Sequence, residues 1–148
     1  MSLDLQVLQV SDLEEILDFE NTKLAKEIPD ETERRFHGWQ ARWRRESLEH
    51  YLRLGWSFAI REEGELLGYF LAQPLLFLDG QTQSLWVEHL QYLNLQARDT
   101  LCDLAVRTSR EKHLQRVYFP TVHNLAPAVA PFRPENWQPQ TSVVKTTK

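Results

Sequence analysis

The sequence predicts that residues 1–148 form a single α/β domain, organised around one strand that leads directly into a long helix. Residues 84–93 are rich in β-branched, aromatic and other large apolar side chains, which is typical of a buried strand. After Asn94 the apolar residues recur at helical spacing, so a helix follows at once. Strand-like and helical patterns also alternate along the rest of the chain, and 42% of its residues are hydrophobic. This hydrophobic content is sufficient for one core.

The first third of the chain is predicted to contain one strand and two helices. Ser11, followed by acidic residues, suits the N-cap of the first helix, and Pro29 marks its end. The apolar pattern after this proline predicts a second helix that continues to Gly55, which suits a C-cap. The predicted ranges are 3–10 for the strand, and 13–24 and 31–54 for the helices.

A β-hairpin and several short elements are predicted on either side of the central strand and helix. In the hairpin, Gly68 permits a bulge or a close approach of two backbones. Asn124 suits the N-cap of a brief helix that runs through Phe132. The predicted ranges are 56–61 and 66–78 for the hairpin strands, 116–120 and 140–147 for two further strands, and 110–113 for the end of the central helix. The element order is therefore β, α, α, β, β, β, α, β, α, β.

Composition excludes several classes of function. The net charge of −4 implies no general attraction to nucleic acid or to an anionic membrane. Acidic residues interrupt the apolar residues near Met1, and no stretch approaches the roughly 20 apolar residues of a membrane span. We therefore expect a cytoplasmic protein without a signal peptide. Cys102 is the single cysteine, which excludes an intrachain disulfide and argues against a zinc site; its place beside the helix stripe favours packing over nucleophilic chemistry.

Basic residues and tryptophans occur together in the predicted helix over residues 31–54. This combination can bind phosphate and stack on bases, which would indicate contact with nucleic acid. However, its six arginines are accompanied by four glutamates. Mixed charge of this kind favours a solvated amphipathic helix whose aromatic residues face the core.

The junction at Asn94 predicts a site for an anionic group. The first turn of a helix has backbone N–H groups without intrahelical acceptors, and these groups bind phosphate well. Whether an anion binds here decides which function the chain has.

The hairpin and the C-terminal tail carry a resemblance to a known family. The hairpin FAIREEGELLGYFLA looks like that family's second and third strands. In the tail, Ala128, Phe132, Asn136 and Trp137 keep the spacing of its A-x-x-x-Y-x-x-x-G-F signature. Over nearly its whole length, the chain resembles the GNAT superfamily of N-acetyltransferases. The resemblance implies a mixed, mostly antiparallel sheet flanked by helices, in which the parallel strands 84–93 and 116–120 splay apart.

The same resemblance implies acetyl-CoA as the cofactor, with its pyrophosphate at the N-terminus of the helix that begins near Leu95. The family's usual turn is Q/R-x-x-G-x-G/A, whereas residues 96–101 contain no glycine. Side chains of Asp99 and Leu101 would crowd the phosphate, while Arg98 would contact it. The implied cofactor-binding residues are Leu90, Gln91, Tyr92, Gln96, Ala97, Arg98, Asp99, Thr100, Asn124 and Phe132.

Acetyl transfer to an amine requires a base and is helped by an acid. Glu88 is the best candidate for the base, with a structural ion pair to an arginine as the alternative. His89 is expected on the opposite face of the strand unless a bulge intervenes. His123 could act as base or acid, or could be an incidental loop residue. Phe132 lacks the hydroxyl of the signature tyrosine, so the acid role is either absent or filled elsewhere. Tyr118 and Tyr92 are the candidate substitutes, with core packing as the alternative for both.

We therefore expect an acetyl-CoA-dependent N-acetyltransferase that acts on an amine of a small molecule or peptide. The alternative is a GNAT-fold module that has lost catalysis and binds a ligand or another protein. No metal, nucleic acid or membrane is expected as a partner, and a homodimer stays open.

Overall fold

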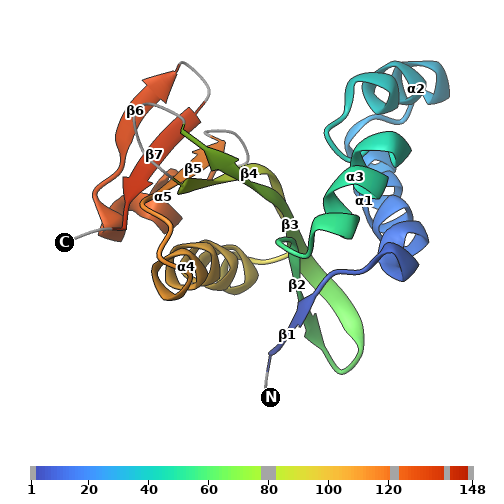
Figure 1. Cartoon of the computed structure of the whole chain (residues 1–148). Helices are drawn as coiled ribbons and strands as arrows, with labels where there is room; N and C mark the ends of the chain where they lie inside the picture. Colours follow the sequence, from blue (N-terminus) through green and yellow to red (C-terminus); the bar gives the residue numbers. More distant parts are fainter. Residues whose placement is uncertain (1–2, 78–82, 121–123, 139–140, 147–148) are drawn as a thin grey trace.

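The computed structural model describes residues 3–77, 83–120, 124–138 and 141–146 (Figure 1). These residues form one seven-stranded sheet in the order β1-β2-β3-β4-β5-β7-β6. The strands are β1 (Asp4–Val7), β2 (Phe58–Glu62), β3 (Glu65–Leu76), β4 (Gln83–Tyr92), β5 (Arg116–Pro120), β6 (Glu135–Gln138) and β7 (Thr141–Lys145). The helices are α1 (Leu13–Glu27), α2 (Glu31–Gln40), α3 (Arg45–Leu54), α4 (Leu95–Glu111) and α5 (Ala126–Val129), with 3-10 turns η1 (Val10–Asp12) and η3 (Ala130–Phe132).

The sheet is mixed and mostly antiparallel, as predicted. Among the described strands, β4 and β5 are the one parallel pair. Their pairing covers three residue pairs, from Ser84 with Arg116 to Trp86 with Tyr118. Beyond Trp86, β4 continues beside β3, whereas β5 continues beside β7. The two parallel strands therefore separate in the direction of the α4 N-terminus.

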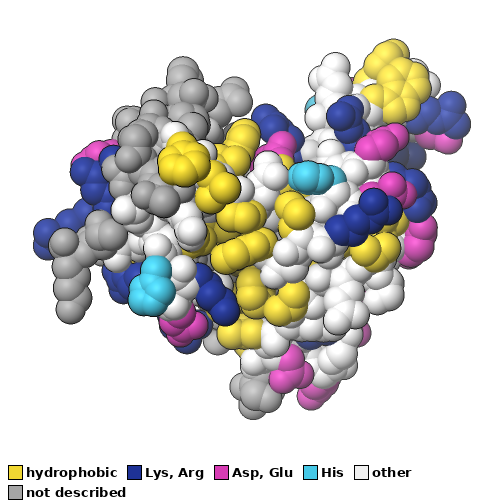
Figure 2. All heavy atoms as spheres, viewed as in Figure 1, with side chains coloured by type: hydrophobic (Ala, Val, Ile, Leu, Met, Phe, Trp, Pro, Cys, Tyr) yellow, Lys and Arg dark blue, Asp and Glu magenta, His cyan; other side chains and the backbone are white. Residues whose placement is uncertain are grey.

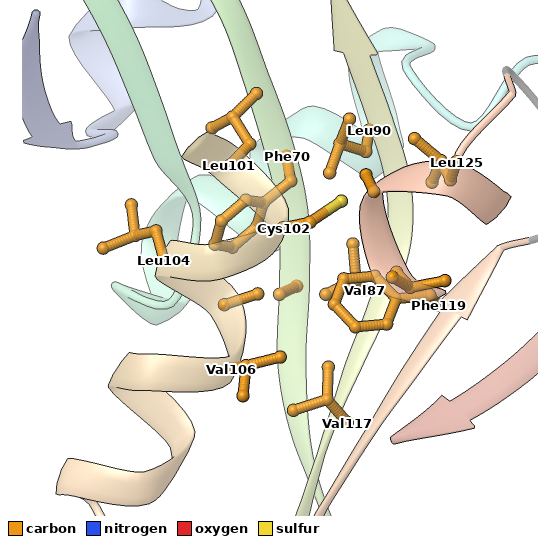
Figure 3. Packing of buried hydrophobic residues seen from close by; sticks show 14 of the residues in the cluster. Phe70, Val87, Leu90, Leu101, Cys102, Leu104, Val106, Val117, Phe119 and Leu125 are labelled. Carbon is orange, nitrogen blue, oxygen red and sulfur yellow. The ribbon is translucent and has the colours of Figure 1, made fainter. Parts of the chain in front are cut away.

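Helices cover both faces of the sheet and enclose two hydrophobic cores. On one face, α4 and α5 pack over the central strands, where Phe70, Leu101 and Phe119 lie at the centre of the larger core (Figure 3). On the other face, α1 and α3 pack over β2 and β3 through a smaller core that includes Ile16 and Leu48. This second layer lies to the right of the sheet in Figure 1.

The predicted continuous helix over 31–54 is wrong, because the chain bends between α2 and α3. Ala41 and Arg44 have extended backbone conformations, so two helices replace one. The apolar face of α3 is buried, but α2 buries none of its residues. Phe36 and Trp39 of α2 are 57% and 66% exposed, contrary to the expectation that they face the core. Figure 2 shows hydrophobic side chains at the α2 end of the molecule.

Three further local predictions need correction. Ser11 lies within η1 and does not cap α1, for which Asp12 is the N-cap residue. Asn124 does not cap α5, because Leu125 is its N-cap residue and Asn124 has a positive φ of 56°. Strand β6 was not predicted; its residues form a strand because they pair with β7 in the folded sheet. The strand predicted over 140–147 is confirmed as β7 within its described residues.

Gly68 makes the close approach that the sequence predicts. A Cβ atom at this position would lie 2.8 Å from the Gln91 carbonyl oxygen and 3.0 Å from Leu101 Cδ1. Glycine therefore allows β3, β4 and α4 to meet beside the β4–α4 junction. The register of β2 and β3 also shifts next to Gly68, between Ile60 and Arg61.

Candidate functional site

A β-bulge in β4 directs two successive side chains toward the layer of α1–α3. The register of β3 and β4 shifts between Leu71 and Ala72, which leaves Glu88 without an opposite residue. Glu88 and the next residue, His89, both hydrogen-bond to groups of the N-terminal helical region. Because of this bulge, His89 and Glu88 lie on the same side of the sheet.

Glu88, the predicted base, forms an ion pair with Arg42. Its Oε1 atom lies 2.5 Å from Arg42 Nη1, and the two side chains are 17% and 58% exposed. Arg42 belongs to the bend between α2 and α3, so this pair ties the bend to β4. The structure therefore contains the ion pair that was the alternative to a catalytic role, and a role as base would require Arg42 to move or Oε2 to accept the proton.

Three buried polar side chains from α1, β3 and β4 form a hydrogen-bonded trio beneath this bulge. The Tyr69 hydroxyl donates to Glu20 Oε1 at 2.5 Å, and His89 Nε2 lies 2.8 Å from the same oxygen. Glu20 is only 3% exposed. Burial, followed by the Glu20 charge and this hydrogen bond, raises the pKa of Tyr69 well above its usual range. Tyr69 therefore stays protonated and acts as a fixed donor to the carboxylate.

A pocket of about 360 Å³ lies above the trio, which is within the usual size range of small-ligand sites. Its walls come from α1, from the end of α2 with the following bend, and from β4. The lining residues are Glu20, Lys23, Leu24, Glu27, His37, Gln40, Ala41, Arg42, Trp43, His89 and Gln91. Glu20 and His89 thus form part of a hollow surface that a small molecule can enter.

The N-terminus of α4 lies on the other side of β4 and already satisfies part of its own hydrogen-bonding capacity. The Asn94 side chain accepts a hydrogen bond from Ala97 N–H at 2.8 Å, and Arg98 N–H donates to the Asn94 carbonyl at 3.2 Å. Asp99 and Thr100 are inside the helix. An anion at this end would therefore have to displace the Asn94 side chain to reach the Ala97 N–H group.

Arg98 is committed to structural contacts. Its Nη1 donates to the Asn124 carbonyl at 3.1 Å, and its Nε donates to Asp99 Oδ1 at 2.9 Å. The residue is buried and connects α4 to the segment before α5. The predicted contact between Arg98 and phosphate would therefore use the guanidinium N–H groups that these bonds leave.

The predicted acid residues have different environments. Tyr118 is buried in β5 and pairs in register with Trp86 and Val143. Phe132 packs against the larger core, as an apolar ring without a hydroxyl should. His123 lies outside the described residues. The roles of Tyr118 and His123 in proton transfer stay predictions.

Cys102 is buried in the larger core, and burial raises the pKa of its thiol to about 12 (Figure 3). It therefore has the environment of a packed residue, as predicted, because a nucleophile requires an accessible thiolate. Within the described ranges, no group of three or more His, Cys, Asp or Glu side chains is arranged to hold a metal ion. None of the helices described is long and apolar enough to cross a membrane.

Arginines around α2 and α3 are largely paired with acidic side chains. Arg35 pairs with Glu31 at 3.4 Å, and Arg45 pairs with Glu14 at 2.8 Å. Together with the pair formed by Arg42, these contacts place an acidic group beside three arginines of this region.

Comparison with known proteins identifies the architecture. An agmatine N-acetyltransferase mutant superposes with a TM-score of 0.70 at 12% identity, covering 98% of this chain and 100% of that one. The polyamine N-acetyltransferase of Drosophila melanogaster gives 0.67 at 13% identity and 97% of both chains. The PaiA N-acetyltransferase of Thermoplasma acidophilum, solved in complex with coenzyme A, gives 0.67 at 13% identity over the full length of both. No family model matches the sequence, and no curated protein matches it.

The chain has the GNAT acetyltransferase fold. In this GNAT fold, β4 carries three predicted cofactor residues that differ in position: Leu90 points into the larger core, Gln91 lines the pocket, and the Tyr92 carbonyl accepts a bond from Lys23 Nζ at 3.1 Å. Gln96 is exposed on the first turn of α4, and Ala97 is buried. The predicted cofactor residues near the β4–α4 junction therefore do not all face one common surface.

Glu20 was not predicted as a site residue. In the sequence it is one of several acidic residues in α1, and helical spacing gives no reason to select it. Its position on the face of α1 that carries Leu13 and Ile16 is the one available signal, because an acidic residue on a buried face requires a partner. That partner, His89, lies 69 residues further along the chain.

Proposed function

We propose that the protein is an acetyl-CoA-dependent N-acetyltransferase that transfers an acetyl group to an amine. The separation of β4 from β5 carries this proposal. Two parallel strands that part after three residue pairs diverge toward the end of β4 at which the α4 N-terminus lies, and a helix N-terminus suits an anionic group. The amine pocket lies on the opposite side of β4, so the donor and the acceptor would approach this strand from two sides.

Acetyl-CoA would supply a thioester carbonyl for attack by the amine nitrogen. The extended part of the cofactor suits the gap between the strands, whose residues include Leu90, Gln91 and Tyr92. The pyrophosphate has fewer hydrogen-bond donors available, because the Ala97 N–H group already donates to the Asn94 side chain. Glu88 is the proposed base, at the bulge closest to both sides, provided that Arg42 releases it.

Agmatine and related polyamines are the acceptors to test first. The agmatine and polyamine acetyltransferases named above share the fold, and the pocket of this chain includes the buried carboxylate of Glu20 on α1. A carboxylate attracts the ammonium or guanidinium group of such a molecule. A cytoplasmic location, as the sequence predicts, belongs to the same proposal.

Isothermal titration with acetyl-CoA and coenzyme A tests the proposal directly. We expect saturable binding of both, followed by release of the free thiol when an amine is added. Glu88→Gln should then lower turnover without lowering the affinity for acetyl-CoA. Saturable binding without thiol release from any amine would contradict the assignment as an enzyme.

A ligand-binding or protein-interaction module is the second candidate, and a specific observation favours it. The α4 N-terminus contains no glycine, is capped by its own asparagine and is followed by an arginine bound within the protein. In this arrangement, hydrogen bonds within the protein satisfy groups at the helix N-terminus that would otherwise be available to a phosphate. The complete absence of heat with both acetyl-CoA and coenzyme A would favour the module.

A further inference from the structure

The Glu20 carboxylate presents two oxygens with different environments. Oε1 receives both hydrogen bonds of the buried trio, from Tyr69 and from His89. Oε2 receives none from any residue that the structure describes, although the side chain is 4% exposed. Oε2 is not one of the fully buried side-chain atoms that lack a hydrogen-bond partner. It is therefore accessible from the pocket that Glu20 lines.

The two cations nearest the pocket do not neutralise Glu20. Lys23 Nζ donates to the Tyr92 carbonyl, and Arg42 pairs with Glu88. Neither forms an ion pair with Glu20 among the described contacts. A buried carboxylate with one unused acceptor is costly to maintain unless a ligand or water completes its hydrogen bonds.

The trio fixes the direction of the unused oxygen. Tyr69 belongs to β3, His89 to the bulge of β4 and Glu20 to α1, so three elements hold one carboxylate. The tyrosine ring lies 5.6 Å from the imidazole ring and 5.9 Å from the Phe19 ring. A carboxylate supported by buried donors on one oxygen is preorganised to accept hydrogen bonds on the other.

We infer that Glu20 is the ammonium-binding residue of this pocket, with Tyr69 and His89 as positioning residues, and that the ligand is a small primary amine whose carbon skeleton packs against apolar side chains. Oε2 accepts a hydrogen bond from the ammonium group, and Leu24 and Trp43 provide apolar contact for the rest of the molecule. This inference rests on the proposed function for its chemistry, but it concerns binding and can be tested without turnover.

The test compares two probes that differ in one group, phenethylamine and phenethyl alcohol, by isothermal titration. Wild-type protein should bind the amine more tightly than the alcohol. Glu20→Gln should weaken amine binding about tenfold or more, because it removes a charge-assisted bond, and should leave alcohol binding unchanged. Unchanged alcohol binding shows that the pocket is intact in the variant, and the melting temperature provides a second check of folding.

Two variants serve as matched controls. Glu27→Gln removes an exposed carboxylate from the same helix and pocket, so amine affinity should change less than about twofold. Tyr69→Phe disturbs the trio but keeps the carboxylate, and should weaken the amine less than Glu20→Gln does.

The inference is overturned if wild-type protein does not prefer the amine, if Glu20→Gln binds the amine as wild type does, or if it loses both probes equally. Amine binding that depends on Glu20 in a protein that never acetylates the amine would support the inference and remove the proposed activity. Acetylation that is unaffected by Glu20→Gln would support the proposed activity and overturn the inference about Glu20.

Discussion

The pocket beneath α1 and the N-terminus of α4 lie on opposite sides of β4 and use their polar groups in opposite ways. In the pocket, Tyr69 and His89 hold a buried carboxylate that lines the cavity. At the helix end, the Asn94 side chain accepts a hydrogen bond from Ala97 N–H, and Arg98 donates to the Asn124 carbonyl oxygen. Both residues therefore bond to other groups of the protein. In the first region, burial of a carboxylate lowers the stability of the fold but leaves an acceptor oxygen at the pocket. In the second region, the asparagine cap stabilises the helix but occupies an N–H group that an anion could bind.

In the proposed acetyltransferase, the amine half and the donor half of the site would be unequally formed. The amine half depends on long-range contacts between α1, β3 and β4. The donor half depends on one local turn, so a few substitutions can change it without disturbing the fold. The predictions below test whether the two regions are as independent as this comparison implies.

Gly68→Ala should have the largest effect on stability, because both regions depend on β3 and β4. The new Cβ atom would meet the Gln91 carbonyl oxygen at 2.8 Å, and we expect a loss of about 2–3 kcal/mol in the free energy of unfolding. Denaturant unfolding measures it. Gly38→Ala is the control: no atom lies within 4 Å, so the helix should gain about 0.5–1 kcal/mol. Equal stability of Gly68→Ala and wild type would refute the close approach.

Tyr69→Phe should destabilise the protein by about 1–2 kcal/mol, because it removes a donor from a buried carboxylate. Acetyl-CoA binding should not change if the two regions are independent. Thermal unfolding and titration with acetyl-CoA measure the two effects. Tyr51→Phe is the matched control, since the Tyr51 hydroxyl has no hydrogen bond within the described part of the chain, and it should cost much less.

Asn94→Ala should cost about 1 kcal/mol through loss of the α4 cap. It also frees the Ala97 N–H group, so coenzyme A should bind severalfold more tightly than to wild type. Asp30→Ala removes a comparable cap from α2, where Asp30 accepts a bond from Thr32 N–H at 3.1 Å. That control should lose similar stability with no change in coenzyme A affinity, and a parallel change in both variants would argue against competition by Asn94.

Glu15→Gln should have the smallest effect, below about 1 kcal/mol, because the pair that Glu15 forms with Arg61 is partly exposed. The hydrogen bond from Arg61 lowers the pKa of Glu15 below its ordinary value of 4.5. The stabilisation is therefore complete above that value and disappears as the pH falls through the lowered pKa. Melting temperatures of the variant and wild type should converge in acid. Glu14→Gln, which alters a more exposed pair, should show a smaller difference at neutral pH.

The sequence by itself determined the order of the main elements and the architecture. Hydrophobic periodicity located β2 to β5 and α4 because each has a continuous pattern of its own. The buried state of Cys102 also follows from local pattern, since a thiol beside a helix stripe favours packing. The glycine in β3 indicated either a bulge or a close approach, and the structure contains the close approach. The Asn94 boundary likewise follows from the change of period.

Tertiary structure decided the features that depend on distant partners. The bend between α2 and α3 places Arg42 against Glu88 of β4, a contact across 46 residues. Strand β6 exists because β7 pairs with it, and neither its length nor its composition predicts a strand. Glu20 became a candidate binding residue because the bulge at Glu88 turns His89 toward α1. Local propensity carries no information about these contacts, because each depends on where the folded sheet places residues that are far apart in the chain.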